Sequence, residues 1–481
     1  MAGTLCRASG GTAAEEIMSG AQPVGPAGGH GGTNPDALLS RELGVRQFGA
    51  NIFNYTVGSG IFSLPAFAVI GLGSAAPLAY VACAIVIGLV VLCFAESGSR
   101  VSSTGGAYAY VETALGPMAG FVAGCLVFTT GWFAAAAVIT AVVRSILALT
   151  SGGQDPWVTR VAMVLVVAVL VTINMRGVRT GARLLETITV VKLVPLLVFI
   201  AVGVFFIDPS NLAWTNVPSA STVLSTAGIM IFAFSGIEGA TVPSGEVKNP
   251  ARTVPLAILL ALGAATILYL AIQFVALGIM GPALANTGNT PLAESAGVAL
   301  GPIARTVMIL AAVVSMFGYL SANVLSEPRG LFAMSRDGFL PRILTSVHPQ
   351  YRTPNLAIGI YGVLVVVVAL LGSLMPDGFR WLTVFANLAA LALYFLCAIG
   401  TLVLRKRDVR TDGQPFVIPG GPLVPIAACV AIAWLFYETI NGKDGGDQLK
   451  SMLIALAVIF ALYGLRALRF KLWPPSTAPA K

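Results

Sequence analysis

The first long apolar segment of the chain is centred on Asn51-Ile52-Phe53-Asn54-Tyr55-Thr56-Val57-Gly58-Ser59-Gly60-Ile61-Phe62. Two glycines flank a serine here, and each glycine costs about 1 kcal/mol relative to alanine in a helix interior. The pattern therefore predicts a helix that is broken at Gly58-Ser59-Gly60. The same small residues also suit close packing against another helix in a membrane, so this second interpretation stays open at this stage.

A broken helix at this place predicts a cavity. Backbone that is not helical persists at membrane depth only where protein groups or a water-filled cavity satisfy its hydrogen bonds. The half-helix that starts near Ile61 would direct free N–H groups and the positive end of its dipole into that cavity. Such an arrangement favours an anionic group, for example a carboxylate.

The composition places the chain among polytopic all-α membrane proteins. Of its 481 residues, 57% are hydrophobic and 10% are charged, and apolar runs of about 20 residues recur along its length. Unbroken apolar runs such as 161–173 and 356–371 exclude a β-barrel, whose strands alternate apolar and polar residues. The six cysteines lack CxxC spacing and mostly lie in apolar segments, so they predict neither a disulfide nor a metal site.

Hydropathy predicts twelve spans and their grouping. The spans are expected at about 47–72, 76–99, 115–149, 157–175, 186–207, 221–245, 254–281, 301–333, 355–374, 380–404, 421–440 and 449–469. Residues 1–42 are expected to form a disordered cytoplasmic tail. The membrane domain is expected at 43–470, with five spans at about 44–207, five more at about 220–405, two accessory spans at about 421–469 and a cytoplasmic tail at 471–481.

The basic residues predict the orientation. If both termini face the cytoplasm, 21 of the 28 Lys and Arg residues lie on the cytoplasmic side, 6 lie on or near the outer side, and Lys192 lies within a span. This bias predicts a multi-pass protein of the cytoplasmic membrane, with both its N-terminus and its C-terminus inside. The net charge of +8 is then a topology signal, and nucleic acid is not an expected partner.

Span 6 carries a second break. Phe232-Ala233-Phe234-Ser235-Gly236-Ile237-Glu238-Gly239-Ala240-Thr241 again places glycines and polar residues near the middle of a span. Spans 1 and 6 occupy matching positions in two sets of five and run in opposite directions. Interrupted segments at matching positions of two halves indicate the binding site of an inverted-repeat transporter.

Two charged residues are expected inside the membrane. Glu238 lies near mid-membrane, where a carboxylate faces a transport pathway or caps the broken half-helix by accepting backbone N–H bonds, and the two roles are compatible. Lys192 lies about 9 Å into the membrane if its helix begins near Glu186. Its ammonium can snorkel to the cytoplasm, lock helices together through backbone carbonyls, or load and release a proton during transport.

Four sets of residues resemble the amino acid-polyamine-organocation superfamily of transporters. They are Gly58-Ser59-Gly60-Ile61-Phe62, Gly105-Gly106-Ala107-Tyr108, Phe234-Ser235-Gly236-Ile237-Glu238 with Glu246-Val247-Lys248-Asn249-Pro250, and Pro328-Arg329 with Met334-Ser335-Arg336-Asp337-Gly338-Phe339-Leu340-Pro341. They stand in the family's order between about Leu43 and Arg407. The resemblance implies the five-plus-five inverted repeat of the LeuT type, with helices 1 and 6 broken and two accessory helices.

The resemblance also implies roles for individual residues. The substrate's carboxylate would be held by the Ser59 hydroxyl and by the amides of Gly60 and Ile61, next to Gly58. Its amino group would meet the carbonyls of Thr56, Phe232 and Ser235, beside Gly236 and Ile237, and Phe232 stands where an aromatic ring closes the outer side. Lys192 matches a helix-5 lysine that replaces a sodium ion in proton-coupled members, and Ser321 is the residue of helix 8 that would face it.

These observations predict a secondary active transporter that moves an amino acid by alternating access. Protons are the expected coupling ion, through Lys192 and with Glu238, so symport is the first hypothesis. An obligate exchanger and a non-transporting amino acid sensor are the alternatives. No HExxH, GxSxG or Walker sequence occurs, so neither an enzyme nor a cofactor is predicted. The amino acid and the oligomeric state are not indicated, although Glu238 is the expected acidic group if the substrate is cationic.

Overall fold

The regular structure of the described residues is helical apart from one isolated parallel bridge between Leu43 and Val247. The computed structural model describes residues 39, 41–148, 155–214, 217–288, 290–375, 378–411, 413–441 and 445–472. The α-helices are α1 (Val45–Thr56), α2 (Gly60–Leu72), α3 (Pro77–Arg100), α4 (Ala107–Leu115), α5 (Pro117–Ala148), α6 (Pro156–Met175), α7 (Val178–Gly203), α8 (Ala220–Phe234), α9 (Ile237–Ala240), α10 (Pro250–Met280), α11 (Pro291–Leu300), α12 (Pro302–Arg336), α13 (Asn355–Ser373), α14 (Gly378–Lys406), α15 (Leu423–Asn441) and α16 (Gly445–Leu472). Nearly all of the expected tail at 1–42, and the end of the chain from 473, lie outside the described residues.

The helices match a polytopic membrane protein. Eight of the described helices are long and apolar enough to cross a membrane, and the bent pair of α1 and α2 makes a ninth such span. Two further segments, Leu423–Glu438 and Met452–Gly464, are apolar but shorter. The total of twelve spans and the inverted repeat therefore stay predictions.

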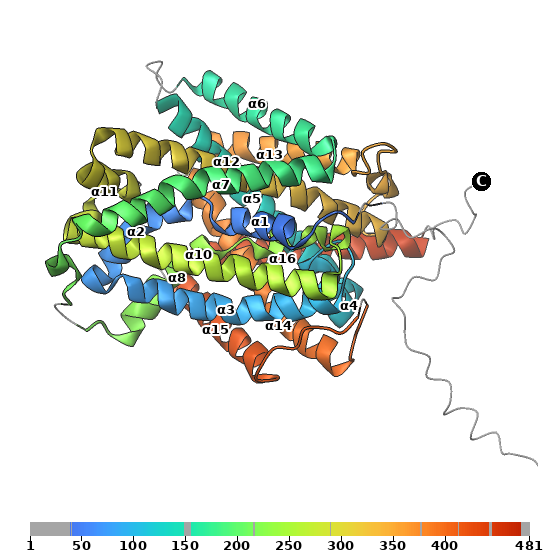
Figure 1. Ribbon diagram of the computed structural model, residues 1–481. Coiled ribbons are helices and arrows are strands. Elements are labelled where there is room, and N and C mark those ends of the chain that lie inside the picture. Colours follow the sequence, from blue (N-terminus) through green and yellow to red (C-terminus); the bar gives the residue numbers. More distant parts are fainter. Residues whose placement is uncertain are drawn as a thin grey trace, which may run out of the picture. The chain divides into compact units, whose positions relative to one another are not determined.

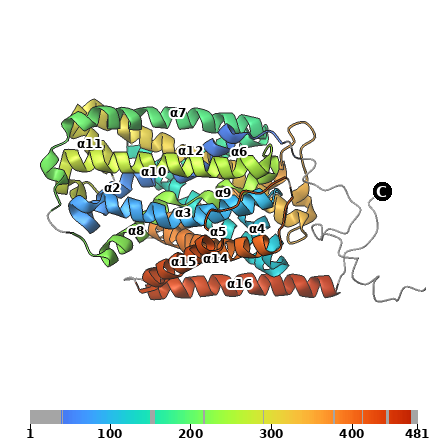
Figure 2. The same cartoon turned by 60° about the horizontal axis from the view of Figure 1, so that its bottom comes forward.

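The long helices pack side by side around α1, α5 and α12 (Figures 1 and 2). Among the spanning helices, α5 is the most deeply buried, and α6 and α7 are the least buried. In Figure 2, α16 runs along the edge of the bundle beside α14 and α15. The outer surfaces of these helices suit contact with lipid, because their side chains are apolar and their backbone groups are hydrogen-bonded within the helix.

The first predicted break is confirmed. Helix α1 ends at Thr56, α2 begins at Gly60, and the two axes meet at 45°. A Cβ atom added at Gly60 would lie 3.0 Å from the Cα atom of Ala233, so glycine also permits a close approach between α2 and α8. The break and the close packing, which the sequence offered as alternatives, therefore occur together.

The second break lies at Ser235 and Gly236, between α8 and α9. Ser235 is extended, whereas Gly236 has φ of +116°, a conformation that side chains with a Cβ rarely adopt. A Cβ on Gly236 would also lie 3.0 Å from the carbonyl oxygen of Tyr55. The two breaks therefore touch each other through backbone, which is possible because this position carries no side chain.

The helix start expected before Lys192 was wrong. Helix α7 begins at Val178 instead of near Glu186. Lys192 therefore lies 14 residues from the start of its helix, or about 21 Å at 1.5 Å per residue. The reason is that the polar residues between 178 and 186 continue the helix beyond the apolar run, so hydropathy alone placed its start too late.

Candidate functional site

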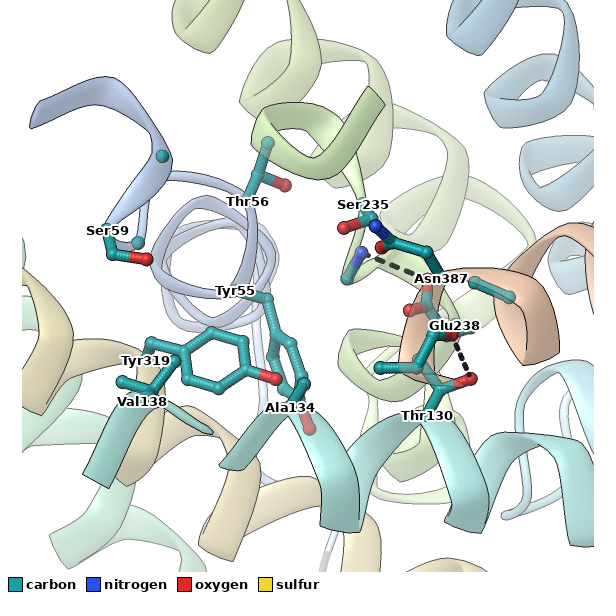
Figure 3. A pocket seen from close by; sticks show the side chains of 15 residues that line it. Tyr55, Thr56, Ser59, Thr130, Ala134, Val138, Ser235, Glu238, Tyr319 and Asn387 are labelled. Atoms are coloured by element: carbon teal, nitrogen blue, oxygen red, sulfur yellow. Dashed lines mark hydrogen bonds between the residues drawn. The ribbon is translucent and has the colours of Figure 1, made fainter. Parts of the chain in front are cut away.

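A cavity lies where the two helix breaks face α5, α12 and α14 (Figure 3). It is lined by Tyr55, Thr56, Gly58, Ser59, Gly60, Thr130, Ala134, Val138, Ser235, Gly236, Glu238, Tyr319, Ala386, Asn387 and Ala390. Its volume is about 30 Å³, which is room for about two water molecules. A solute larger than this enters the cavity only if the lining helices move apart.

Side chains from α7, α10 and α12 donate hydrogen bonds to the backbone carbonyls at the first break. The Tyr269 hydroxyl on α10 donates towards the carbonyl oxygens of Thr56, at 2.9 Å, and Ala233, at 2.8 Å. It therefore ties the end of α1 to the end of α8. The family resemblance assigned the Thr56 carbonyl to the substrate's amino group. That carbonyl already accepts a hydrogen bond from Tyr269.

Lys192 is bound to the same break. Its Nζ atom donates to the carbonyl oxygen of Val57 at 2.7 Å, and its side chain is fully buried. Ser315 on α12 donates to the carbonyls of Val57 and Gly58, each at 2.9 Å. Of the interpretations considered for the lysine, snorkelling to the cytoplasm is excluded, because the ammonium is held at the helix break.

The serine beside this lysine site was assigned wrongly. Ser315 shares the Val57 carbonyl with Lys192, whereas the buried Ser321 hydroxyl has no hydrogen-bond partner in the described part of the chain. Six residues, or about 1.7 helical turns, separate the two serines, so they point in different directions from α12. Which residues of a long helix face a given site depends on its contacts with other helices, and the sequence of the helix alone does not specify them.

The amide groups of the first break differ from its carbonyls in their hydrogen bonding. Among the described residues, no hydrogen bond involves the backbone N–H of Ser59 or of Ile61. The Ser59 hydroxyl lines the cavity beside them. The start of α2 therefore offers donors to an anionic group, as the first residues of a helix generally do.

Glu238 caps the second break. Its Oε2 atom accepts a hydrogen bond from the Gly236 amide at 3.0 Å and another from the Tyr394 hydroxyl at 2.6 Å. The capping interpretation is confirmed by these contacts. Because Glu238 also lines the cavity (Figure 3), the cap and a role in the transport pathway stay compatible.

The back of the cavity consists of residues that the sequence did not identify. Helix α5 contributes Thr130, Ala134 and Val138, α12 contributes Tyr319, and α14 contributes Ala386, Asn387 and Ala390. Most of these are small or apolar residues within long apolar helices. No break, charge or motif distinguishes them from residues that face lipid, so only the packing identifies them.

Several residues predicted for the site do not line the cavity. Ile61 and Ile237 are buried in the packing behind the two breaks, and Lys192 reaches the site only through the Val57 carbonyl. Phe232 lies within α8, and its side chain is outside the described part of the structure. The assignment of a closing ring to Phe232 therefore stays a prediction.

Residues 43–463 match the profile of the amino acid permease family. The chain belongs to this family. The methylthioribose transporter of Bacillus subtilis is 28% identical over 79% of the chain and 85% of its own length. The branched-chain amino acid permease of the same species is 27% identical (90% and 94% covered), and its serine/threonine exchanger is also 27% identical (90% and 98% covered). The resemblance drawn from the sequence motifs is confirmed.

Three of the motif segments contact one another away from the cavity: the glycine loop at Gly105, the segment after α9, and the end of α12 at Arg336. The Gly105 amide donates to the Val242 carbonyl at 2.9 Å, which joins the glycine loop to the segment after α9. The Tyr108 hydroxyl donates to Asp337 at 2.8 Å, and Arg336 forms an ion pair with the same carboxylate. The ion pair between these two neighbouring residues therefore also anchors α4 through Tyr108.

Glu112 on α4 lies close to this cluster and outside the membrane-spanning helices. Burial and the neighbouring Asp337 carboxylate raise the pKa of Glu112 to about 7, from an ordinary value of 4.5. The folded permease thus binds this proton more tightly than the unfolded chain does. The stability that the folded protein gains from the proton on Glu112 is fully present below about pH 4.5 and is lost as the pH rises through about 7.

The Glu112→Gln variant tests this. We expect a higher melting temperature than for the wild type at pH 8, where Gln avoids the buried charge, and little difference at pH 4.5, where Glu112 is neutral. Thermal unfolding in detergent at both pH values measures the effect. Glu294→Gln is the control, because Glu294 pairs with the exposed Arg305. An equal shift at both pH values would contradict the assignment.

Proposed function

We propose that this permease moves an amino acid across the cytoplasmic membrane by alternating access, with both termini in the cytoplasm. The observation that carries the proposal is the pair of helix breaks facing one cavity, with backbone donors at the start of α2 beside the Ser59 hydroxyl. Polar backbone groups in hydrocarbon are costly when they lack partners. A zwitterion supplies a carboxylate and an ammonium group, so it satisfies both ends of such a site.

The carboxylate of the substrate is assigned to the start of α2. The Ser59 hydroxyl and the amides of Gly60 and Ile61 are its donors. The ammonium group is assigned to the carbonyls of Thr56, Phe232 and Ser235. Because Tyr269 already donates to Thr56, we assign the ammonium chiefly to the second break.

Protons are the proposed coupling ion, with Lys192 as the coupling residue and Glu238 as its partner in the pathway. The lysine supports the conformation of the first break by donating to Val57. A neutral lysine loses part of this interaction, because a charged donor forms a stronger hydrogen bond than a neutral one. Loss of the proton would therefore loosen the same backbone that binds the substrate.

Obligate exchange is the second candidate. One relative is named a serine/threonine exchanger and covers 90% of the chain. Exchange uses the same cavity and the same two breaks but requires no proton movement. Net uptake into empty vesicles separates the two functions, since an exchanger needs an internal substrate.

A binding screen followed by counterflow tests the proposal. Purified permease is first heated with each common amino acid and with methylthioribose, because a ligand that binds the folded state raises its melting temperature. The compound that raises it most is then used for counterflow in proteoliposomes. Stabilisation without counterflow would indicate a sensor, and stabilisation by methylthioribose alone would contradict an amino acid substrate.

Gly58→Val tests the position of the site. Gly58 lines the cavity, and a Cβ atom there makes only ordinary contacts, at 3.7 Å from Tyr319, so the first added carbon fits without moving a neighbour. The added methyl groups occupy the cavity, and we expect at least about a tenfold loss of affinity in the binding screen, or about 1.4 kcal/mol. Gly88→Val on α3 is the matched control, because its Cβ meets no atom within 4 Å. Unchanged binding by Gly58→Val would place the substrate elsewhere.

A further inference from the structure

Glu327 on α12 is a second buried carboxyl group close to the cavity, and the function proposed above does not use it. Its side chain is 1% exposed. Its Oε1 atom accepts a hydrogen bond from the Tyr55 hydroxyl at 3.2 Å, and its Oε2 atom is buried without a partner in the described residues. A buried oxygen without a partner is costly, so its presence calls for an explanation.

Two glycines make the space for this carboxyl group. A Cβ atom at Gly131 on α5 would lie 2.6 Å from the carboxyl carbon of Glu327. A Cβ atom at Gly239 on α9 would collide with Oε1 and lie 2.6 Å from the Tyr55 hydroxyl oxygen. Glu327 is therefore enclosed by α1, α5, α9 and its own helix, and any larger residue at either glycine would displace it.

The groups that face Glu327 do not include a cation. Tyr55 faces it from α1, Glu238 from α9, Tyr361 from α13 and Tyr319 from α12, while α5 presents Gly131. Among the described residues Glu327 forms no ion pair. The nearby cations are engaged elsewhere, Arg329 with Glu246 and Lys192 with Val57.

Glu238 and Glu327 therefore have different surroundings. Glu238 accepts two hydrogen bonds on one oxygen, from a backbone amide and a tyrosine. Glu327 accepts one, and a negative charge on it would stand near Glu238, with both carboxyl groups buried. Two neighbouring carboxyl groups in such different settings do not both ionise, and the one with fewer donors keeps its proton.

Glu327 lies at a junction that alternating access must open. Tyr55 and Gly239 belong to the segments beside the two breaks, whereas Glu327 and Gly131 belong to α12 and α5. Asn51 joins the same parts, because its Nδ2 atom donates to Ala240 at 2.9 Å and to Ser326 at 3.0 Å. Glu327 is about 14 Å along α12 from its end at Arg336, which is the cytoplasmic end in the orientation proposed above.

We propose that Glu327 is a proton-binding site that couples proton movement to opening of the permease at the Arg336 end of α12. While α1 and α9 pack on α12, the carboxyl group is neutral. When they separate, water reaches Oε2, the carboxyl O–H bond breaks, and the proton passes to water and leaves a carboxylate. The charged group then disfavours closure until it is protonated again. The inference rests on the proposed transport function and assigns it a third titratable residue.

The Glu327→Gln variant tests the coupling, since Gln resembles the neutral carboxyl group in size. Proteoliposomes contain a pH-sensitive dye, and L-serine, L-threonine and L-leucine are added separately. The wild type is expected to acidify the vesicle interior with a substrate, and Glu327→Gln is expected to lose this acidification while counterflow of the same amino acid persists. Glu186→Gln is the matched control, because that carboxylate pairs with the exposed Arg46. Acidification by Glu327→Gln equal to that of the wild type would overturn the proposal.

The outcomes separate this inference from the proposed function. Wild-type counterflow without any acidification overturns proton coupling at Glu327 but leaves amino acid exchange in place. Absence of wild-type counterflow with every amino acid counts against the proposed function itself.

Infrared spectroscopy tests the protonation state without any substrate. The wild type at neutral pH is expected to show the C=O band of a neutral buried carboxyl group, which Glu327→Gln lacks and Glu327→Asp shifts. If Glu327→Gln does not fold, the Asp variant still gives the assignment. A spectrum without a band that depends on Glu327 means that the group is ionised, and the proposal is then wrong.

Discussion

Replacing Arg329 with methionine is expected to destabilise the folded permease by about 3–5 kcal/mol. The Arg329 guanidinium is fully buried, forms an ion pair with the buried Glu246 carboxylate, and also donates to the Leu325 carbonyl. Methionine fills much of the same space but removes the Arg329 guanidinium from the buried Glu246 carboxylate. The loss is large because removing one partner exposes the full desolvation cost of the other.

Loss of the Arg329–Glu246 ion pair is also expected to affect the start of the membrane domain. Glu246 accepts a backbone hydrogen bond from Leu43 at 3.0 Å, and Lys248 donates back to Leu43 at 2.8 Å. The ion pair therefore holds α12, the segment after α9 and the residues before α1 together. We expect the variant to loosen this end of the bundle first.

A double-mutant cycle checks the explanation. The free energy of unfolding in detergent is compared for Arg329→Met, Glu246→Gln and the two combined, and the combination is expected to recover much of the loss because no buried charge remains. Arg305→Met is the control, since its exposed pair with Glu294 is worth about 0–1 kcal/mol. A double variant no more stable than Arg329→Met alone would contradict the charge-based account.

Replacing Lys192 with methionine is expected to reduce the initial rate of net uptake by at least about tenfold, or about 1.4 kcal/mol of transition-state stabilisation. Lys192 donates to the Val57 carbonyl at the first break, and a thioether cannot do so. Folding should be little affected, because Ser315 still donates to the same carbonyl and a buried charge has been removed. The effect thus falls on transport rather than on stability.

Uptake and thermal unfolding are measured on the same preparations of Lys192→Met. Ser315→Ala is the comparison, because it leaves the lysine in place and removes only the neutral donor to Val57 and Gly58. We expect it to retain proton-dependent uptake at a lower rate. Wild-type uptake by Lys192→Met would show that the lysine is structural.

The sequence predicted those features that depend on local composition. Apolar runs identified the spans, the Gly58-Ser59-Gly60 and Ser235-Gly236 patterns identified the two breaks, and the motif order identified the family. These three features can be recognised from residues close together in sequence. Helix propensity, hydropathy and the preference of glycine for positive φ all depend on a few neighbouring positions. The cap was one of the two roles predicted for Glu238, and its backbone partner Gly236 lies only two residues away.

The sequence failed where the partner lies far along the chain. It assigned Ser321 to the lysine site that Ser315 occupies, and it did not identify Glu327, whose partner Tyr55 lies on α1. It did not identify the residues of α5 and α14 that line the cavity. A register between packed helices is set by interdigitating side chains from several segments, which no single segment encodes.

Local composition by itself thus determined that this chain crosses a membrane repeatedly, where two of its spans break, and to which family it belongs. Only the tertiary structure decided what satisfies the broken backbone: Tyr269, Lys192 and Ser315 on its carbonyls, while the amides of Ser59 and Ile61 have no partner in the part of the chain that the structure describes. The physical reason is that the need for a hydrogen-bond partner arises locally, whereas the partner is brought by helices distant in sequence that pack around the break.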